Sequence, residues 1–213
     1  MERSFVEIAV ALCGHEGLGL APDVVADLVP GDLLAQVPAT LLRFWHEVGA
    51  ANELLSCFHR FRRPSDIELH DGNLIFLEEN QHVVLWAVST GDDDPPVLQY
   101  PVLDEGLDGP FPEGVRLADF LRSVLVMQAA QGSDFMPHVG YVEREAGGAS
   151  LLANSGLAAL PPVGDLAAFF APGIAATVVG DEDSETIIVG TRTEADLERF
   201  AALFGLSRTA FEL

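Results

Sequence analysis

Three strand-like segments in the middle of the chain constrain the fold more than any other feature. Residues 74–77 are all apolar, residues 83–88 read Val-Val-Leu-Trp-Ala-Val, and residues 97–100 return to the same character. Polar links that carry turn residues separate them, and apolar runs bounded in this way are typical of strands. Strands joined by links this short pair with their neighbours in sequence, so this region predicts an antiparallel meander.

The flanking segments have helical spacing. Apolar residues recur three and four positions apart after Ser4, after Pro38 and over residues 117–131, which predicts helices there. Ser4 is expected to cap the first helix, and Gly14 or Gly17 to end it. Gly49 is a plausible end for the second.

The last third of the chain contains both strand-like and helix-like patterns of apolar residues. Residues 138–143, 176–179 and 186–189 are predicted as strands, the last two forming a hairpin around residues 180–184. Residues 165–170 are predicted as a short helix, residues 146–149 as a flexible loop, and Thr193 as the cap of a final helix.

Strands and helices do not alternate regularly along the chain, which favours an α+β fold with a central, mostly antiparallel sheet packed against helices. The chain has 213 residues, and 49% of them are hydrophobic. That is enough to bury one substantial core without disulfides or metals. We therefore expect a single domain over residues 1–213.

The charge balance limits the kinds of partner. There are 33 acidic and 11 basic residues, a formal net charge of -22, and every base is arginine. Such a surface repels phosphate backbones and anionic lipid, so nucleic acid and membranes are not expected partners. A basic protein would be attracted. The competing interpretation, of about equal weight, is that the acidity only maintains solubility.

Location follows from what the sequence lacks. The apolar stretch at residues 8–13 is short and flanked by acids, unlike a signal peptide. No apolar run approaches the roughly 20 residues of a membrane-spanning helix. The two cysteines, Cys13 and Cys57, do not make a disulfide framework. These features favour the cytoplasm.

Acidic residues concentrate in the predicted sheet. Between Arg63 and Arg116 there are 12 acids and neither Arg nor Lys. They form either a solvated, aggregation-resistant rim or a negative interaction face, and we slightly favour the face. The residues expected to contribute to partner binding are Glu78, Glu79, Asp92, Asp93 and Asp94. The opposite cluster, made of Arg60, Arg62 and Arg63, is expected mainly to pair with the chain's own acids.

No pattern of catalytic or metal-binding residues appears. The six histidines and two cysteines do not pair at ligand spacing, so no metal and no cofactor is expected. There is no nucleophile elbow and no phosphate-binding glycine loop. Cys57 and His59 are two positions apart, where helical side chains diverge. We therefore expect a protein that is not an enzyme.

Two segments resemble the SUKH superfamily, the proteins grouped with the fungal cell-wall-assembly regulator family. The residues from Val37 and Pro38 to Gly49 are similar to its opening helix. The stronger match runs from the Asp71-Gly72-Asn73 turn through Glu79-Asn80-Gln81 and the strand with Trp86 to Asp94-Pro95-Pro96-Val97. The resemblance covers about residues 38–131, and residues 132–213 are expected to be the C-terminal part of the same domain.

The resemblance implies an antiparallel sheet packed on helices and no catalytic residues. It also implies an immunity protein that binds and neutralises a toxin domain, such as a basic nuclease. The alternative is an intracellular regulatory or scaffolding adaptor of the same fold with a non-toxin partner. An acidic protein suits the first role because it can cover the basic nucleic-acid site of a nuclease.

Overall fold

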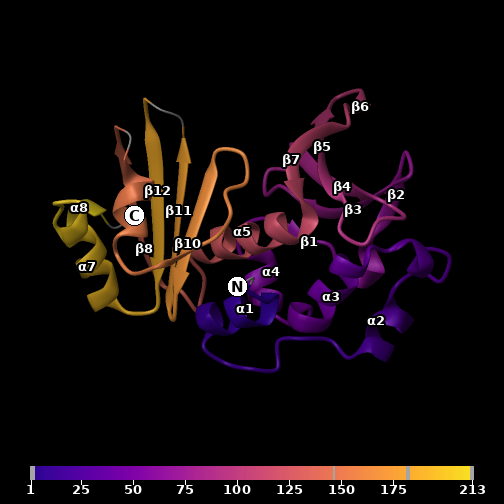
Figure 1. Cartoon of the computed structure of the whole chain (residues 1–213), viewed down its shortest axis with the longest axis horizontal. Coiled ribbons are helices and arrows are strands. Elements are labelled where there is room, and N and C mark those ends of the chain that lie inside the picture. The colour runs from indigo at the N-terminus through magenta and orange to yellow at the C-terminus, as the bar shows by residue number, and fades with distance from the viewer. Residues whose placement is uncertain (1–2, 146, 181–182, 212–213) are drawn as a thin grey trace. The chain divides into compact units, whose positions relative to one another are not determined.

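The computed structural model describes residues 3–145, 147–180 and 183–211. Its contacts divide the chain into two compact units (Figure 1). The middle unit is Gly17–Leu121, and the terminal unit combines Met1–Glu16 with Arg122–Leu213. The boundary in sequence falls inside helix α5 (Leu117–Ala130). Whether both units act as one domain over residues 1–213 stays a prediction.

The middle unit contains a seven-stranded antiparallel sheet. Its central strands β3 (Asn73–Glu78), β4 (Val84–Ser89) and β5 (Pro96–Leu103) pair in sequence order, which confirms the predicted meander. The remaining strands are short additions at its sides: β1 (Arg60–Phe61) and β2 (Glu68–His70) on β3, and β6 (Gly106–Leu107) and β7 (Phe111–Arg116) on β5. The sequence patterns did not reveal these four.

Helices cover one part of this sheet's apolar surface. The middle unit contributes α2 (Pro22–Leu28), α3 (Ala39–Val48) and α4 (Asn52–Ser56), with two 3-10 turns at Leu34–Gln36 and Pro64–Asp66. Pro38 precedes α3 and Gly49 ends it, as predicted. Phe44 of α3 lies 5.1 Å from Phe61, ring centre to ring centre. Phe120, in the first turns of α5, lies 5.9 Å from Phe76.

The terminal unit has its own five-stranded antiparallel sheet. Strands β8 (His138–Arg144), β10 (Leu166–Ala171), β11 (Ile174–Gly180) and β12 (Glu185–Thr191) follow the order β8-β12-β11-β10-β9, where β9 is Ala158–Ala159. Helix α1 (Phe5–Cys13) contacts β10 and β11. Ser4 and Glu7 form its capping box and Gly14 ends it at φ 81°, so this predicted helix is confirmed.

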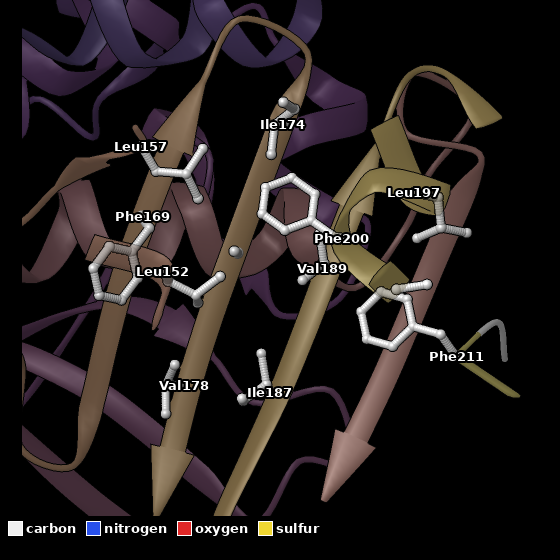
Figure 2. Packing of buried hydrophobic residues seen from close by; sticks show 12 residues of the cluster. Leu152, Leu157, Phe169, Ile174, Val178, Ile187, Val189, Leu197, Phe200 and Phe211 are labelled. Atoms are coloured by element: carbon white, nitrogen blue, oxygen red, sulfur yellow. The ribbon is translucent and has the colours of Figure 1, made fainter. Parts of the chain in front are cut away.

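An apolar cluster joins the terminal sheet to α7 (Glu194–Leu203) and α8 (Arg208–Phe211). Figure 2 shows Leu197 and Phe200 of α7 lying over the strands, beside Ile174 and Val189. Thr193 caps α7 through its hydroxyl oxygen, which accepts a hydrogen bond from the Asp196 N–H. The final helix is therefore confirmed.

Two local predictions in this unit are wrong. The predicted helix at residues 165–170 is instead mostly strand β10 (Leu166–Ala171), because six residue pairs tie β10 to β11, and Ala168, Phe169 and Phe170 are buried. Pairing within the sheet overrides the weak local pattern. The expected loop at residues 146–149 overlaps α6 (Gly148–Ala153), whose Gly148 N–H donates to Glu185. Residue 146 and the hairpin residues 181–182 lie outside the described part.

The architecture confirms the α+β fold, with antiparallel sheets packed against helices. Among the helices that the structure describes, none has the length and apolar character needed to cross a bilayer. The position of the acidic residues on the middle sheet is what bears on function.

Candidate functional site: the acidic ends of the middle sheet

The five predicted contact residues lie at opposite ends of the meander. Glu78 is the last residue of β3 and Glu79 follows it, whereas residues 92–94 follow the end of β4. Because β3 and β4 are antiparallel, the end of β4 lies beside the start of β3, at Asn73. Six residues of strand span roughly 17 Å. The structure therefore separates the five carboxylates into two groups.

Glu78 is a buried ion-pairing residue. It is 7% exposed, and its carboxylate pairs with Arg60 and, at 2.9 Å, with Arg62. The His82 ring nitrogen Nδ1 lies 3.1 Å from Glu78 Oε1. Burial alone would raise the pKa of Glu78, but the hydrogen bond from Arg60 and the charge of Arg62 outweigh it and lower that pKa. This carboxylate holds β1 and β3 together at their ends.

Glu79 shapes the turn between β3 and β4. Its carboxylate Oε2 accepts the Gln81 N–H at 2.6 Å, and its own N–H donates to the Val84 carbonyl at 2.9 Å. The turn also contains Asn80, whose N–H donates to Nδ1 of His59 at 3.3 Å. Glu79 is half-buried, so it presents only part of its carboxylate to a partner.

His59 lies under this turn in an aromatic setting. It is 7% exposed, and its ring lies 4.7 Å from Phe58 and 5.3 Å from Trp86. Burial lowers the pKa of His59, and the nearby charge of Glu79 only partly offsets the effect. Trp86 donates its indole N–H to Glu113 at 2.5 Å. These contacts hold the half-buried Trp86 against side chains of the same unit.

The second group of carboxylates, at residues 92–94, lies at the other end of the sheet. Asp92 pairs with Arg116 at 3.1 Å and accepts the Asp94 N–H at the same distance. The hydrogen bond from Asp94 and the Arg116 guanidinium lower the pKa of Asp92. Asp94 accepts the Ala118 N–H at 2.9 Å, at the start of α5. Asp93 is exposed, and its carbonyl accepts the Thr40 N–H.

An exposed surface that the sequence patterns did not single out lies at the Glu79 end. Large apolar side chains reach solvent there, since Val83 is 50% exposed and Leu103 55%. Phe111, opposite Gln99 in the middle of β5, is 44% exposed. Exposed Asp104, Glu105 and Asp108 accompany them. We call these six residues the apolar–acidic tip.

Backbone pairing brings the parts of the tip together. The Val102 N–H donates to the Val83 carbonyl at 2.8 Å, which puts Val83 beside the end of β5. Leu103 pairs with Gly106 across the β5–β6 hairpin, and the Asp108 N–H donates to the Pro101 carbonyl. Phe111, the first residue of β7, pairs with Gln99 in the middle of β5. The available sequence signal was the apolar Leu103 directly before Asp104, in a segment with no predicted strand.

These ends present carboxylates and apolar side chains to solvent. Within the described residues, no three His, Cys, Asp or Glu side chains gather as metal ligands would. Cys13 and Cys57 are half-buried and are not joined to each other in a disulfide. The basic cluster behaves largely as predicted, because Arg60 and Arg62 both pair with Glu78.

Comparison with protein-family models, with curated proteins and with solved structures gave no match. The chain is thus defined here by its own architecture, as an α+β protein with one antiparallel sheet in each of two compact units. Membership of the SUKH superfamily stays a prediction from the sequence resemblance.

Proposed function

We propose that this protein is a non-catalytic binding protein whose partner is a basic protein domain, held at the apolar–acidic tip. The observation that carries the proposal is that Val83 and Leu103 are exposed at the end of the sheet that also carries three exposed acids, and that exposed Phe111 lies opposite Gln99 of the adjoining strand β5. Exposed apolar groups rimmed by charge are typical of protein interaction sites.

Charge supports a basic partner. The chain carries a net charge of -22, and no Lys or Arg occurs between Arg63 and Arg116. A positively charged domain approaching the tip is attracted over the whole encounter, which raises the association rate most at low ionic strength. The apolar side chains then supply contact area that salt does not screen.

The five carboxylates predicted from the sequence contribute to different degrees to the proposed binding surface. Glu79 lies in the turn next to Val83 and contributes to the tip's field. Glu78 is neutralised by its own arginines, and Asp92 and Asp94 stabilise the opposite end. Asp93 is exposed there and steers only from a distance. In this proposal the tip residues make the contact and the other acids supply long-range attraction.

The sequence resemblance supports a more specific role. We propose that the protein is a cytoplasmic immunity protein that neutralises a toxin domain of the basic nuclease type by covering its nucleic-acid site. The partner's cationic site would face Asp104, Glu105 and Asp108. The alternative is a regulatory or scaffolding adaptor that uses the same surface for a non-toxin partner.

The test uses the full chain as bait in lysate of the source organism, at about 50 and about 300 mM salt. The tip variant replaces Asp104, Glu105 and Asp108 with lysine. A matched control replaces exposed Asp134, Asp165 and Glu198 of the terminal unit with lysine, which changes the net charge equally. We expect a basic protein that the control retains, the tip variant loses and high salt weakens.

The captured domain is then expressed alone and together with this protein. Growth arrest by the domain, relieved by co-expression of the wild-type chain and not of the tip variant, is the result expected of an immunity protein. A harmless partner that still depends on the tip supports the adaptor instead. Equal loss of binding in both triple variants contradicts a docking role for the tip, because it leaves only the effect of net charge.

A further inference from the structure

A small pocket in the middle unit is formed by none of the residues of the apolar–acidic tip. Its volume is about 150 Å³, and it opens between the α3–α4 region and the segment that contains β1 and the following 3-10 turn. The polar groups in its lining are Asn52, Ser56, Arg60, Arg62, Arg63 and Asp66. Three of the chain's 11 basic residues therefore line one pocket of a protein with a net charge of -22.

Arg62 has unused hydrogen-bonding capacity. Its guanidinium lies 2.9 Å from Glu78 and 3.5 Å from Glu68. Its Nε is nevertheless buried, with no hydrogen-bond partner in the part of the chain that the structure describes. Leaving a buried N–H unpaired is unfavourable, and more so for a charged group. A hydrogen-bond acceptor that enters the pocket would supply the missing partner for the Arg62 Nε–H.

Arg63 supplies an uncommitted positive charge. It is exposed, and within the described residues no carboxylate pairs with its guanidinium. The neighbouring Asp66 accepts a hydrogen bond from the Ser65 hydroxyl at 2.7 Å. Ser56 donates its hydroxyl to the Asn52 carbonyl, also at 2.7 Å. The amide side chain of Asn52 lines the pocket and can donate to an anion.

The rest of the lining is apolar. Trp45, Leu55 and Phe61 contribute to the wall and are each less than 10% exposed. A ligand must therefore combine an acceptor for guanidinium groups with an apolar body. A carboxylate matches the forked N–H groups of arginine better than a single-point acceptor does.

We propose that this pocket binds a small organic monocarboxylate, with its carboxylate toward Arg62 and Arg63 and its apolar body against Trp45, Leu55 and Phe61. A single charge is favoured over a phosphate dianion because the surrounding field of this acidic protein opposes each added negative charge. This site is independent of the tip and of the partner proposed above.

Benzoate is a suitable probe, and benzamide is its neutral counterpart of the same shape. Binding to the full-length protein is measured by calorimetry and by chemical-shift changes of the Asn52 and Arg63 amides. We expect benzoate to bind at roughly millimolar concentration, and benzamide about tenfold more weakly, because it lacks the charge-assisted hydrogen bonds.

The critical variant is Arg63→Gln, because Arg63 is exposed and its removal should not disturb folding. It is expected to weaken benzoate binding about tenfold. The control is Arg199→Gln on α7, which removes one exposed charge from the terminal unit. Thermal unfolding of both variants checks that they stay folded.

Three results would overturn the proposal. They are equal binding of benzoate and benzamide, benzoate binding that Arg63→Gln leaves unchanged, and no shift of the Asn52 and Arg63 amides at benzoate concentrations of about 10 mM. None of these depends on whether the tip binds a basic protein.

Discussion

The two sheets of this protein differ in what they leave exposed. Of the seven exposed large apolar side chains among the described residues, six belong to the middle unit. The terminal unit contributes only Val179, and its sheet is filled by the cluster around Phe169, Ile187 and Phe200. Leaving apolar area in water is unfavourable, and its concentration in one unit supports the proposal that this unit carries a binding surface.

The units also differ in how the sheet ends are fixed. In the terminal unit, the cluster between the strands and α7 is apolar. In the middle unit, a buried carboxylate with two arginines fixes β1 against β3, and aspartates fix the other end. The stability of the middle unit should therefore depend on charge and pH, and that of the terminal unit on the volume of its buried side chains.

The largest expected effect is on the terminal core. Phe200 is 1% exposed and packs against the strands, so Phe200→Ala should lower the free energy of unfolding by about 4 kcal/mol through lost burial and a cavity. Urea unfolding followed by circular dichroism measures this. Half-buried Phe204 is the matched control, and Phe204→Ala should cost clearly less. Equal losses would contradict a core centred on Phe200.

The next effect is on the buried ion pairs of the middle unit. Glu78→Gln keeps the shape but removes the charge that compensates Arg60 and Arg62. Breaking a pair of this kind leaves a charge without its partner, and we expect a loss of roughly 3 kcal/mol in urea unfolding. Glu68→Gln is the control, because Glu68 is 57% exposed and 3.5 Å from Arg62. A loss no larger than that of the control would show that Glu78 is dispensable.

A smaller effect is expected at the start of α5. Asp94→Ala removes the acceptor of the Ala118 N–H, and loss of such a helix-end hydrogen bond costs about 1 kcal/mol. The neighbouring Asp93→Ala removes an equal charge from an exposed side chain and should leave thermal stability nearly unchanged. If both variants lose the same stability, net charge and not capping is responsible.

The smallest effect concerns pH and His59. Burial lowers the pKa of His59 below the value of about 6.5 that an imidazole has in the unfolded chain. As pH falls below about 6.5, the unfolded state therefore takes up a proton at His59 before the folded state does. The free energy of unfolding should decrease over this range, and the decrease should end once pH is below the pKa of His59 in the folded protein. At neutral pH both states hold His59 neutral, so the effect vanishes there.

His59→Gln tests this by keeping a hydrogen-bond acceptor for the Asn80 N–H. Unfolding free energies at pH 5.5 and 7.5 should differ less in this variant than in the wild type. His15→Gln is the control, because His15 is exposed on the terminal unit. An unchanged pH dependence in His59→Gln would assign the effect to other groups.

Local patterns predicted most of the regular elements. The cap at Ser4, the helix after Pro38 and the strands on both sides of Glu79 follow from short-range chemistry. The failure at residues 165–170 has the opposite cause, because β10 is defined by its partner β11. Three additional strands of the middle sheet, β1, β2 and β6, were missed because two or three residues form no detectable period. Strand β7 has six residues but contains Pro112 and Gly114, which do not indicate a strand.

The candidate site was less predictable than the fold. The acidic interval between Arg63 and Arg116 is a property of the sequence, but which acids reach solvent is not. Glu78 looks equivalent to Glu79 in the sequence, yet it is buried between arginines, while Glu79 caps a turn. The exposed Leu103 and Phe111 became visible only with β6 and β7 in place.

The sequence by itself determined the α+β class, the antiparallel meander and the strong negative charge, because these depend on residues close together in the chain or on composition alone. Only the tertiary structure decided that Glu78 and Asp92 lie at opposite ends of the sheet and that Arg62 and Arg63 share a pocket. The physical reason is that strand register and burial depend on partners distant in sequence, and they determine which charges are compensated and which remain available for binding.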